Sequence, residues 1–588
     1  MIMKIEKYIN IYSIFLLSFL FHLPLIFQGL DVTDEGYHLT HQVASFASKV
    51  DVDCISLPYF LSDFVGGFWL SLIGMPCLIW ARIGGLLLIS VNSSIIYSIL
   101  SIYFDRHKAL AAVLITSLFI TIRSGYIIDY YSFPAFLLCI QLWLFNQIIK
   151  HSWEGKNNDR FSFLLGFLTI PIILSRIPLL LLLFIPAILF IYYKFLNKDL
   201  SIAIHVSKIS AIGMASSVIF FSFFYWHLGI LSSLPAIIDI MWGSAIGRSE
   251  SHNMTDLLML YLRCYRLVFD LSILLVFGFL ILIKFIKILK IDNCYKQQIP
   301  VLITIIVLFL IEICVLYRPE IANTLAYVLS SESIGFVLIF AGIYFYYTQG
   351  SNLKLKLLLI AGVIIMMMNH IGSNTGIYKS SYGMWLVFPL SILCVDQVWG
   401  RISCIRSDFR LSFLKSALTI FLILAIFFQF SNIYRDVPNR LELDTAFSDS
   451  SLFGIFSTAE RVEVVDEMLS QIKRYAEKND EILIVGVAPM FYYLTETKPA
   501  MGHPWLFLLS EEMIQIKQQK SLDRGSYPKF VIISKVETEY WTWPDDKMIG
   551  SETEPLKYNY LINVYINKLN YTFLWENRAF ALYGRTKS

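Results

Sequence analysis

Three carboxylates stand at the end of the first long apolar run of this chain. Residues 9–30 are mostly apolar, and Asp31, Asp34 and Glu35 follow directly. Because an apolar run of this length can cross a bilayer, the acids lie at the mouth of a membrane helix. Acids near hydrocarbon are costly unless they face water, protein or a partner, and a carboxylate there can act as a general base. An ordinary acidic juxtamembrane loop would explain one such residue. The polar residues of the rest of the chain therefore decide whether these acids are catalytic or belong to such a loop.

The composition indicates a polytopic membrane protein. Of the 588 residues, 57% are hydrophobic and only 15% are charged, which gives a mean hydropathy of +0.64. A soluble protein of this size could not bury that much apolar surface. The first apolar run is too long for a secretory signal and is interpreted as an uncleaved span. The net charge of +3 does not favour nucleic acid, and the eight scattered cysteines argue against a disulfide framework or a CxxC metal site.

Apolar runs predict about thirteen transmembrane helices. Lys and Arg are concentrated in the loops on the side of the N-terminus, which places that end in the cytoplasm. An odd number of spans then places the acidic first loop and the C-terminal tail outside. The predicted spans lie near residues 9–30, 82–103, 109–122, 133–149, 161–175, 177–195, 203–225, 267–289, 299–317, 322–347, 355–369, 383–399 and 412–430.

The outer loops carry further residues that could act on a phosphate. Cations on this face run against the positive-inside bias, so orientation of the chain does not explain them. Arginine in particular suits a phosphate, because its planar fork can donate two parallel hydrogen bonds. Several acids and arginines on one face suggest a site for a phosphate and a proton transfer. The outer residues are Arg82 at the start of the second span, Arg123 and Asp129, Arg176 between two spans, and His370 and Lys379.

The composition changes after Phe430, and the remaining residues predict a small α/β domain. We therefore predict a membrane module over residues 1–430, with interfacial helices in its first outer loop (31–81), and a second domain over residues 431–588. The second domain shows no glycine-rich phosphate loop and no His/Cys cluster. Its predicted elements are an amphipathic helix from Ser457 to Asn479, strands at 481–488 and Phe530–Ser534, and a hairpin of Tyr571–Trp575 with Ala579–Tyr583.

An ordered set of short motifs resembles the GT-C superfamily of glycosyltransferases, in its bacterial branch near protein O-mannosyltransferases and aminoarabinose transferases. The set begins with Asp34-Glu35-Gly36-Tyr37 after the first span, which resembles the family's Asp-Glu pair followed by a small residue and Tyr. The Lys-Pro-Pro of many members is absent, and residues 61–69 occupy that region. The other matching segments are Arg82-Ile-Gly-Gly, Asp129, Arg176-Ile-Pro and residues 481–494.

The resemblance implies a GT-C-like membrane glycosyltransferase. Such an enzyme would move a sugar, with inversion, from a polyprenyl-phosphate donor to an envelope glycan, lipid or protein, at the outer face of a bacterial inner membrane. Asp34 would be the general base, and Glu35 and Asp129 would orient it or the acceptor. No cofactor is required, no spacing demands a metal, and a divalent cation between acids and phosphate is compatible. The residues expected to bind the sugar or the phosphate are Arg82, Arg123, Arg176, Tyr37, His370 and Lys379.

Other classes of protein remain open from the sequence. A flippase or transporter of lipid-linked sugars would place ionisable residues within spans and show repeat symmetry, whereas here the charges cluster in outer loops. An O-antigen polymerase or ligase would depend on a large late outer loop, whereas here the acids lie in the first loop. A purely structural membrane protein would not need Asp34, Glu35 and Asp129 to share a face with three arginines.

Overall fold

The protein is described by a computed structural model. It describes residues 10–47, 57–121, 125–153, 159–196, 198–233, 255–270, 273, 319–348, 352–371, 376–399, 410–431, 433–545 and 555–585. The predicted span at 299–317, and all but the first residues of that at 267–289, lie outside these ranges.

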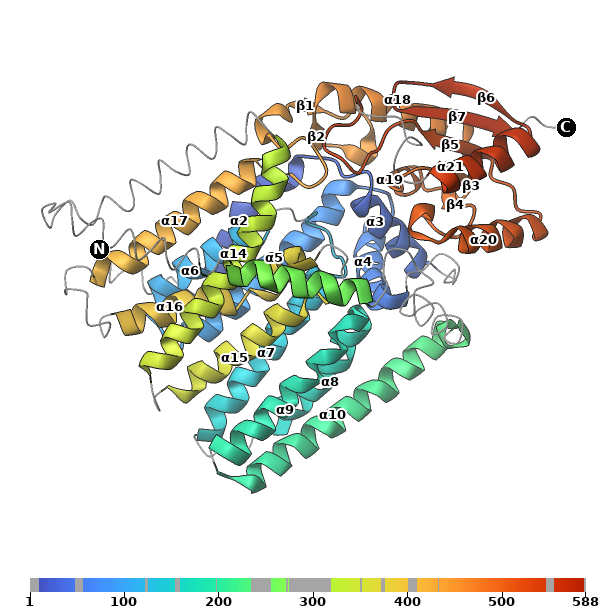
Figure 1. Cartoon of the computed structure of the whole chain (residues 1–588). Coiled ribbons are helices and arrows are strands. Elements are labelled where there is room, and N and C mark those ends of the chain that lie inside the picture. The colour runs from blue at the N-terminus through green and yellow to red at the C-terminus, as the bar shows by residue number, and fades with distance from the viewer. Residues whose placement is uncertain are drawn as a thin grey trace, which may run out of the picture.

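The first three quarters of the chain form a bundle of apolar helices (Figure 1). Among the described residues, α5, α10 and residues 132–150 of α7 are long and apolar enough to cross a membrane. These helices support the predicted membrane location, while the number of spans stays a prediction. The helical elements that coincide with predicted spans are α2 (Ile11–His22) with η1 (Leu23–Phe27), α5 (Leu78–Leu100), α6 (Arg106–Ile120), α7 (Ser132–Trp153), α8 (Asp159–Ser175), η3 (Ile177–Leu183) with α9 (Phe184–Ile191) and η4 (Tyr192–Leu196), α10 (Leu200–His227), α14 (Pro319–Tyr347), α15 (Leu353–Met368), α16 (Val387–Trp399) and α17 (Arg410–Ser431).

The loop after α2 forms two helices that pack on each other, α3 (Asp34–Ser45) and α4 (Phe60–Ser71). Their close approach depends on two glycines of α4. A Cβ added at Gly66 would lie 2.4 Å from Gln42 Cδ, and one at Gly67 would lie 2.1 Å from the Gln42 carbonyl oxygen. Because real Cβ atoms do not approach so closely, only glycine lets α4 lie this near α3.

A five-stranded sheet follows the helical bundle and confirms the predicted C-terminal sheet region. Parallel strands have to be covered on both faces, which explains the uninterrupted apolar runs of β3 and β5. Ile482 and Ile484 of β3 pack towards α18 (Ala459–Tyr475), and Leu483 and Val485 pack towards α20 (Glu511–Asp523) and α21 (Pro555–Ile562). The strand order is β4 (Lys498–Pro499), β3 (Glu481–Val485), β5 (Phe530–Ser534), β7 (Phe580–Arg585) and β6 (Tyr571–Glu576), with β4, β3 and β5 parallel and the hairpin β6–β7 antiparallel.

The sheet region lies at one end of the bundle, beside α3 and α4 (Figure 1). Its short helix α19 (Met490–Leu494) packs on α3, and the Met490 backbone N–H donates to the Val32 carbonyl at 3.0 Å. Gly36 makes this contact sterically possible, since a Cβ there would lie 2.1 Å from Met490 N. The C-terminal region therefore fixes the backbone that carries Asp34 and Glu35.

Candidate functional site

Helix α3 begins at the acidic motif because a buried carboxylate caps it. Asp31 Oδ1 accepts from the backbone N–H groups of Thr33 (2.8 Å) and Asp34 (3.1 Å), and Asp31 Oδ2 accepts from that of Glu35 (3.0 Å). These bonds satisfy donors that a helix start leaves free. The first turn also favours the negative charge of Asp34 and Glu35 through the helix dipole. Asp31 is therefore structural, and the two following acids point in different directions.

Asp34 faces a polar segment that follows α17. The Tyr434 hydroxyl donates to Asp34 Oδ2, and the Arg435 guanidinium lies 3.2 Å from the same oxygen. The Asp34 side chain is still 29% exposed. The carboxylate is thus held by two side chains while part of it stays open to an incoming group.

Arg435 is itself held in an unusual backbone conformation. Its φ of 55° lies in the left-handed region, which costs a non-glycine residue of the order of 1 kcal/mol or more. Buried Arg461 donates to the Arg435 carbonyl (3.1 Å) and to Asp436 Oδ1 (2.7 Å), and Asp436 Oδ2 accepts from the Leu30 N–H at 2.7 Å. This network ties the Tyr434–Arg435 turn to the loop before α3. Sequence reasoning missed it, although three consecutive polar residues after an apolar run were a usable signal.

A second acidic group lies beside α3. Gln42, two turns after Asp34, donates to the Ile128 carbonyl at 2.5 Å, so α3 is bonded to the loop that carries Asp129. Asp129 Oδ1 accepts from the Tyr131 and Ser132 N–H groups at 3.0 and 2.6 Å and so caps α7. The structure thus brings the loop of Asp129 onto the face of α3 that starts at Asp34.

Aromatic rings connect this face to Arg176. Tyr130 stacks on Tyr59 and packs on Tyr131, with ring centroids 4.2 Å apart in both pairs. The Arg176 guanidinium lies over the Tyr131 ring, 4.5 Å from its centroid, and 5.8 Å from that of Tyr130. His38 of α3 completes the row, 4.8 Å from the Tyr130 ring. A row of contacting side chains therefore runs from His38 of α3 to the buried Arg176.

Arg176 also joins the loop that follows α15 to this row of side chains. Its Nη1 donates to the Asn369 carbonyl, and its Nη2 donates to the Ile371 carbonyl at 3.4 Å. Between these two residues lies buried His370, whose Nε2 is 2.9 Å from the Tyr265 hydroxyl. Arg176 and His370 are thus neighbours, and their common role in binding the donor stays a prediction. Lys379 lies in the 3₁₀ helix η7 (Gly376–Gly383), and Arg123 lies outside the described residues.

Glu35 and Arg82 pair with each other on the other side of the acidic loop. Arg82 Nε and Nη2 donate to the two Glu35 oxygens at 3.0 and 2.7 Å, and its Nη1 and Nη2 also donate to the Ile26 and Gly29 carbonyls. Burial raises the pKa of Glu35 to about 7, and the guanidinium of Arg82 opposes that rise. All three nitrogens of Arg82 donate within the protein, so its geometry fits a clamp on the loop better than a free phosphate ligand.

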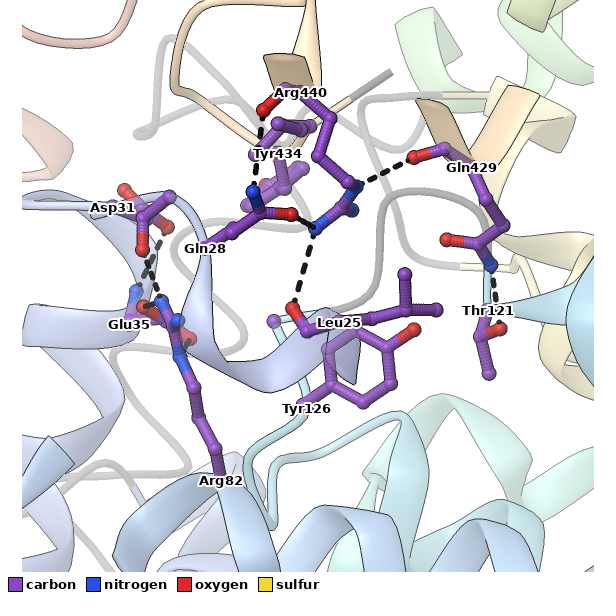
Figure 2. A pocket seen from close by; sticks show the side chains of 13 residues that line it. Leu25, Gln28, Asp31, Glu35, Arg82, Thr121, Tyr126, Gln429, Tyr434 and Arg440 are labelled. Carbon is purple, nitrogen blue, oxygen red and sulfur yellow. Dashed lines mark hydrogen bonds and ion pairs between the residues drawn. The ribbon is translucent and has the colours of Figure 1, made fainter. Parts of the chain in front are cut away.

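A small pocket lies on this side (Figure 2). Its polar groups largely bond one another: Arg440 donates to the Gln429 carbonyl at 2.8 Å, and Gln28 donates to the Arg440 carbonyl at 3.2 Å. Gln429 in turn donates to Thr121 Oγ1 at 2.9 Å. These contacts join the ends of α2, α6 and α17 around the Glu35–Arg82 pair. The residues that line the pocket therefore stabilise the loop that carries Asp31 and Glu35.

Tyr37 lies at the boundary between α3 and the C-terminal region. Its ring is 4.4 Å from that of His41, and it contacts His503 and Trp505 at 6.0 and 6.1 Å. Trp505 also lies under the Arg435 guanidinium, 5.5 Å from it. The C-terminal region thus supplies aromatic groups next to the residues that hold Asp34.

A metal ion would need several His, Cys, Asp or Glu side chains around one point. Within the described residues, no group of three or more His, Cys, Asp and Glu side chains is arranged to hold a metal ion. Asp34 is engaged by Tyr434 and Arg435, and Asp129 accepts backbone donors. Both carboxylates therefore bond to groups of the protein.

Comparison with known proteins gives structural likenesses only. No protein-family model matches the sequence, and no curated protein matches it. The fold is similar to ArnT from Cupriavidus metallidurans in the apo state (10% identity, TM-score 0.48, 98% of this chain and 97% of that chain) and to the same protein bound to undecaprenyl phosphate (12%, 0.44, 98% of both). It is also similar to an Archaeoglobus fulgidus oligosaccharyltransferase tethered with an acceptor peptide (12%, 0.47, 98% of this chain and 74% of that chain). At these identities and TM-scores no residue's role is transferred, so roles are assigned from contacts within this chain.

Proposed function

We propose that this protein is an inverting membrane glycosyltransferase of the GT-C type. It would transfer a sugar from a polyprenyl-phosphate donor to an envelope glycan, lipid or protein acceptor. The observation that carries the proposal is the row of contacting side chains that runs from partly exposed Asp34 and His38 on α3 through Tyr130 and Tyr131 to Arg176. In the proposal, Asp34 at one end of this row is the base, and Arg176 at the other end binds the phosphate of the donor.

The reaction divides between these two ends. At one end, Asp34 takes the proton of the acceptor hydroxyl or amine as that group attacks the anomeric carbon. At the other end, Arg176 stabilises the charge that develops on the lipid phosphate as the bond from the anomeric carbon to oxygen breaks. Tyr434 and Arg435 hold the Asp34 carboxylate, and Asp129 fixes the facing loop. No step requires a cofactor, and a divalent cation near the phosphate is compatible with the proposal.

The stereochemistry of the product tests this mechanism. The purified protein in nanodiscs is given polyprenyl-phosphate sugars of known anomeric configuration, and the product is analysed by NMR. Attack on the face opposite the phosphate predicts a product of inverted configuration together with free polyprenyl phosphate. A retained configuration would contradict direct attack and would require a covalent intermediate.

The proposed location is a bacterial inner membrane, with the N-terminus in the cytoplasm and the C-terminal domain in the periplasm. The distribution of Lys and Arg between loops supports this orientation. Reporters fused after Ser431 test it, because a periplasmic reporter should be active there and a cytoplasmic reporter silent. The opposite pattern would place the site on the cytoplasmic face and overturn the proposed orientation.

A further inference from the structure

We infer that His38 and Asp63 form a positioning pair for the acids of this site. In this pair, Asp63 holds the His38 imidazole in its charged form, one helical turn from Asp34. The inference rests on the proposed function, which assigns catalysis to Asp34. Neither residue of the pair would touch the reacting atoms.

Both side chains of the pair are buried, so a charge on either one requires a compensating partner. His38 on α3 is 5% exposed and Asp63 on α4 is 0% exposed, and His38 Nδ1 lies 3.9 Å from Asp63 Oδ1. Among the described residues, His38 Nδ1 and both Asp63 oxygens lack a hydrogen-bond partner. A buried carboxylate without hydrogen bonds is strongly unfavourable unless a cation compensates it. His38, at this distance, can supply that cation.

The acids around His38 come from three separate segments. Asp34 lies on its own helix, Asp63 on α4, and Asp129 on the loop before α7, while the uncharged Tyr130 ring packs on the imidazole. Burial alone would lower the pKa of His38, but Asp63, Asp129 and Asp34 together raise it above its ordinary value of 6.5. Burial raises the pKa of Asp63 to about 6, with His38 opposing. Asp63 is therefore ionised at neutral pH, and the surrounding acids favour the charged form of His38.

A charged His38 has a direct consequence for catalysis. It offsets part of the negative charge of the surrounding acids while a charged phosphate donor binds nearby. As pH rises through the pKa of His38, this positive charge is lost. The rate of transfer should then fall on the alkaline side, and that fall is the signature of the pair.

The pH dependence of kcat/KM for the donor tests this inference in nanodiscs. Asp63→Asn should lower the pKa of His38 and move the alkaline limb to lower pH by about one unit. His38→Gln should abolish that limb, and Asp63→Glu should restore it close to its original pH. Asp396→Asn is the matched control, because Asp396 pairs with Lys108 at the opposite end of α6, and it should leave the limb in place. A limb that stays fixed in Asp63→Asn, with the rate reduced equally at every pH, would overturn the inference.

A second readout does not depend on sugar transfer. A histidine whose pKa is raised by folding contributes stability that is full below its ordinary pKa of 6.5 and is lost as pH rises through the raised value. The apparent unfolding temperature of the wild type should therefore exceed that of Asp63→Asn most below pH 6.5, and the difference should shrink at higher pH. A difference that is constant with pH would overturn the charged pair. A wild type with this pH signature but no sugar transfer would instead refute the proposed function alone.

Discussion

Asp34→Asn is expected to lower sugar transfer by roughly a hundred- to ten-thousand-fold, the usual contribution of a general base. The amide keeps the size of the carboxylate and can still accept from Tyr434, but it cannot take a proton. Donor binding should persist, because Arg176 and its aromatic neighbours are unchanged. Transfer from a labelled donor and donor binding are measured on the same nanodisc preparation.

Two controls separate catalysis from folding in this experiment. Asp396→Asn removes a carboxylate that pairs with Lys108 and should leave transfer unchanged. Glu35→Gln should chiefly destabilise the protein, since it leaves the buried Arg82 charge without its partner. Wild-type turnover in folded Asp34→Asn would show that the base lies elsewhere, with Asp129 as the next candidate.

Arg176→Ala is expected to weaken use of the donor by roughly ten- to a hundredfold. Hydrogen bonds to charged groups contribute about 1.5–3 kcal/mol, and the substitution removes the buried fork at the end of the aromatic row. Arg176→Lys should recover part of the loss, because it keeps the charge and loses the fork geometry. The dissociation constant of polyprenyl phosphate and the KM for the donor are the quantities to measure.

Arg176 also donates to two backbone carbonyls, so its removal has a structural effect that must be distinguished. The unfolding temperature reports that effect, and a purely structural role would lower stability without raising the KM for the donor. Arg578→Ala is the matched control, because Arg578 lies on the exposed β6–β7 turn and pairs with Asp545. Unchanged donor use in folded Arg176→Ala would move the phosphate site to another cation of these loops, with Arg123 as the next candidate.

Apolar runs, amphipathic periodicity and turn residues predicted helices and strands of the fold, because each of these signals depends on residues that are neighbours in sequence. Long apolar runs correspond to α5 and α10, and the amphipathic run at 457–479 forms α18 at Ala459–Tyr475. The hairpin around Asn577 also occurs where its turn residues indicated. The two-residue strand β4 gave no such signal, because its pairing with β3 is a tertiary contact rather than a local preference.

The site was harder to predict, because its partners are distant in sequence. Tyr434 and Arg435 reach Asp34 across 400 residues, and no spacing rule connects them. From the sequence we predicted that Glu35 acts with Asp34 and that Arg82 binds phosphate. In the structure Glu35 and Arg82 pair with each other. Consecutive helical residues point about 100° apart, so the direction of each acid depends on how α3 is packed.

The most direct test compares donor binding with single-turnover transfer in Asp34→Asn and Arg176→Ala, measured in one nanodisc system with a labelled polyprenyl-phosphate sugar. The proposed function predicts that Asp34→Asn binds the donor as the wild type does and fails to transfer the sugar, whereas Arg176→Ala loses affinity for the donor. Wild-type transfer by Asp34→Asn would contradict the assignment of Asp34 as the base. Wild-type donor affinity in folded Arg176→Ala would contradict the assignment of Arg176 as the phosphate ligand.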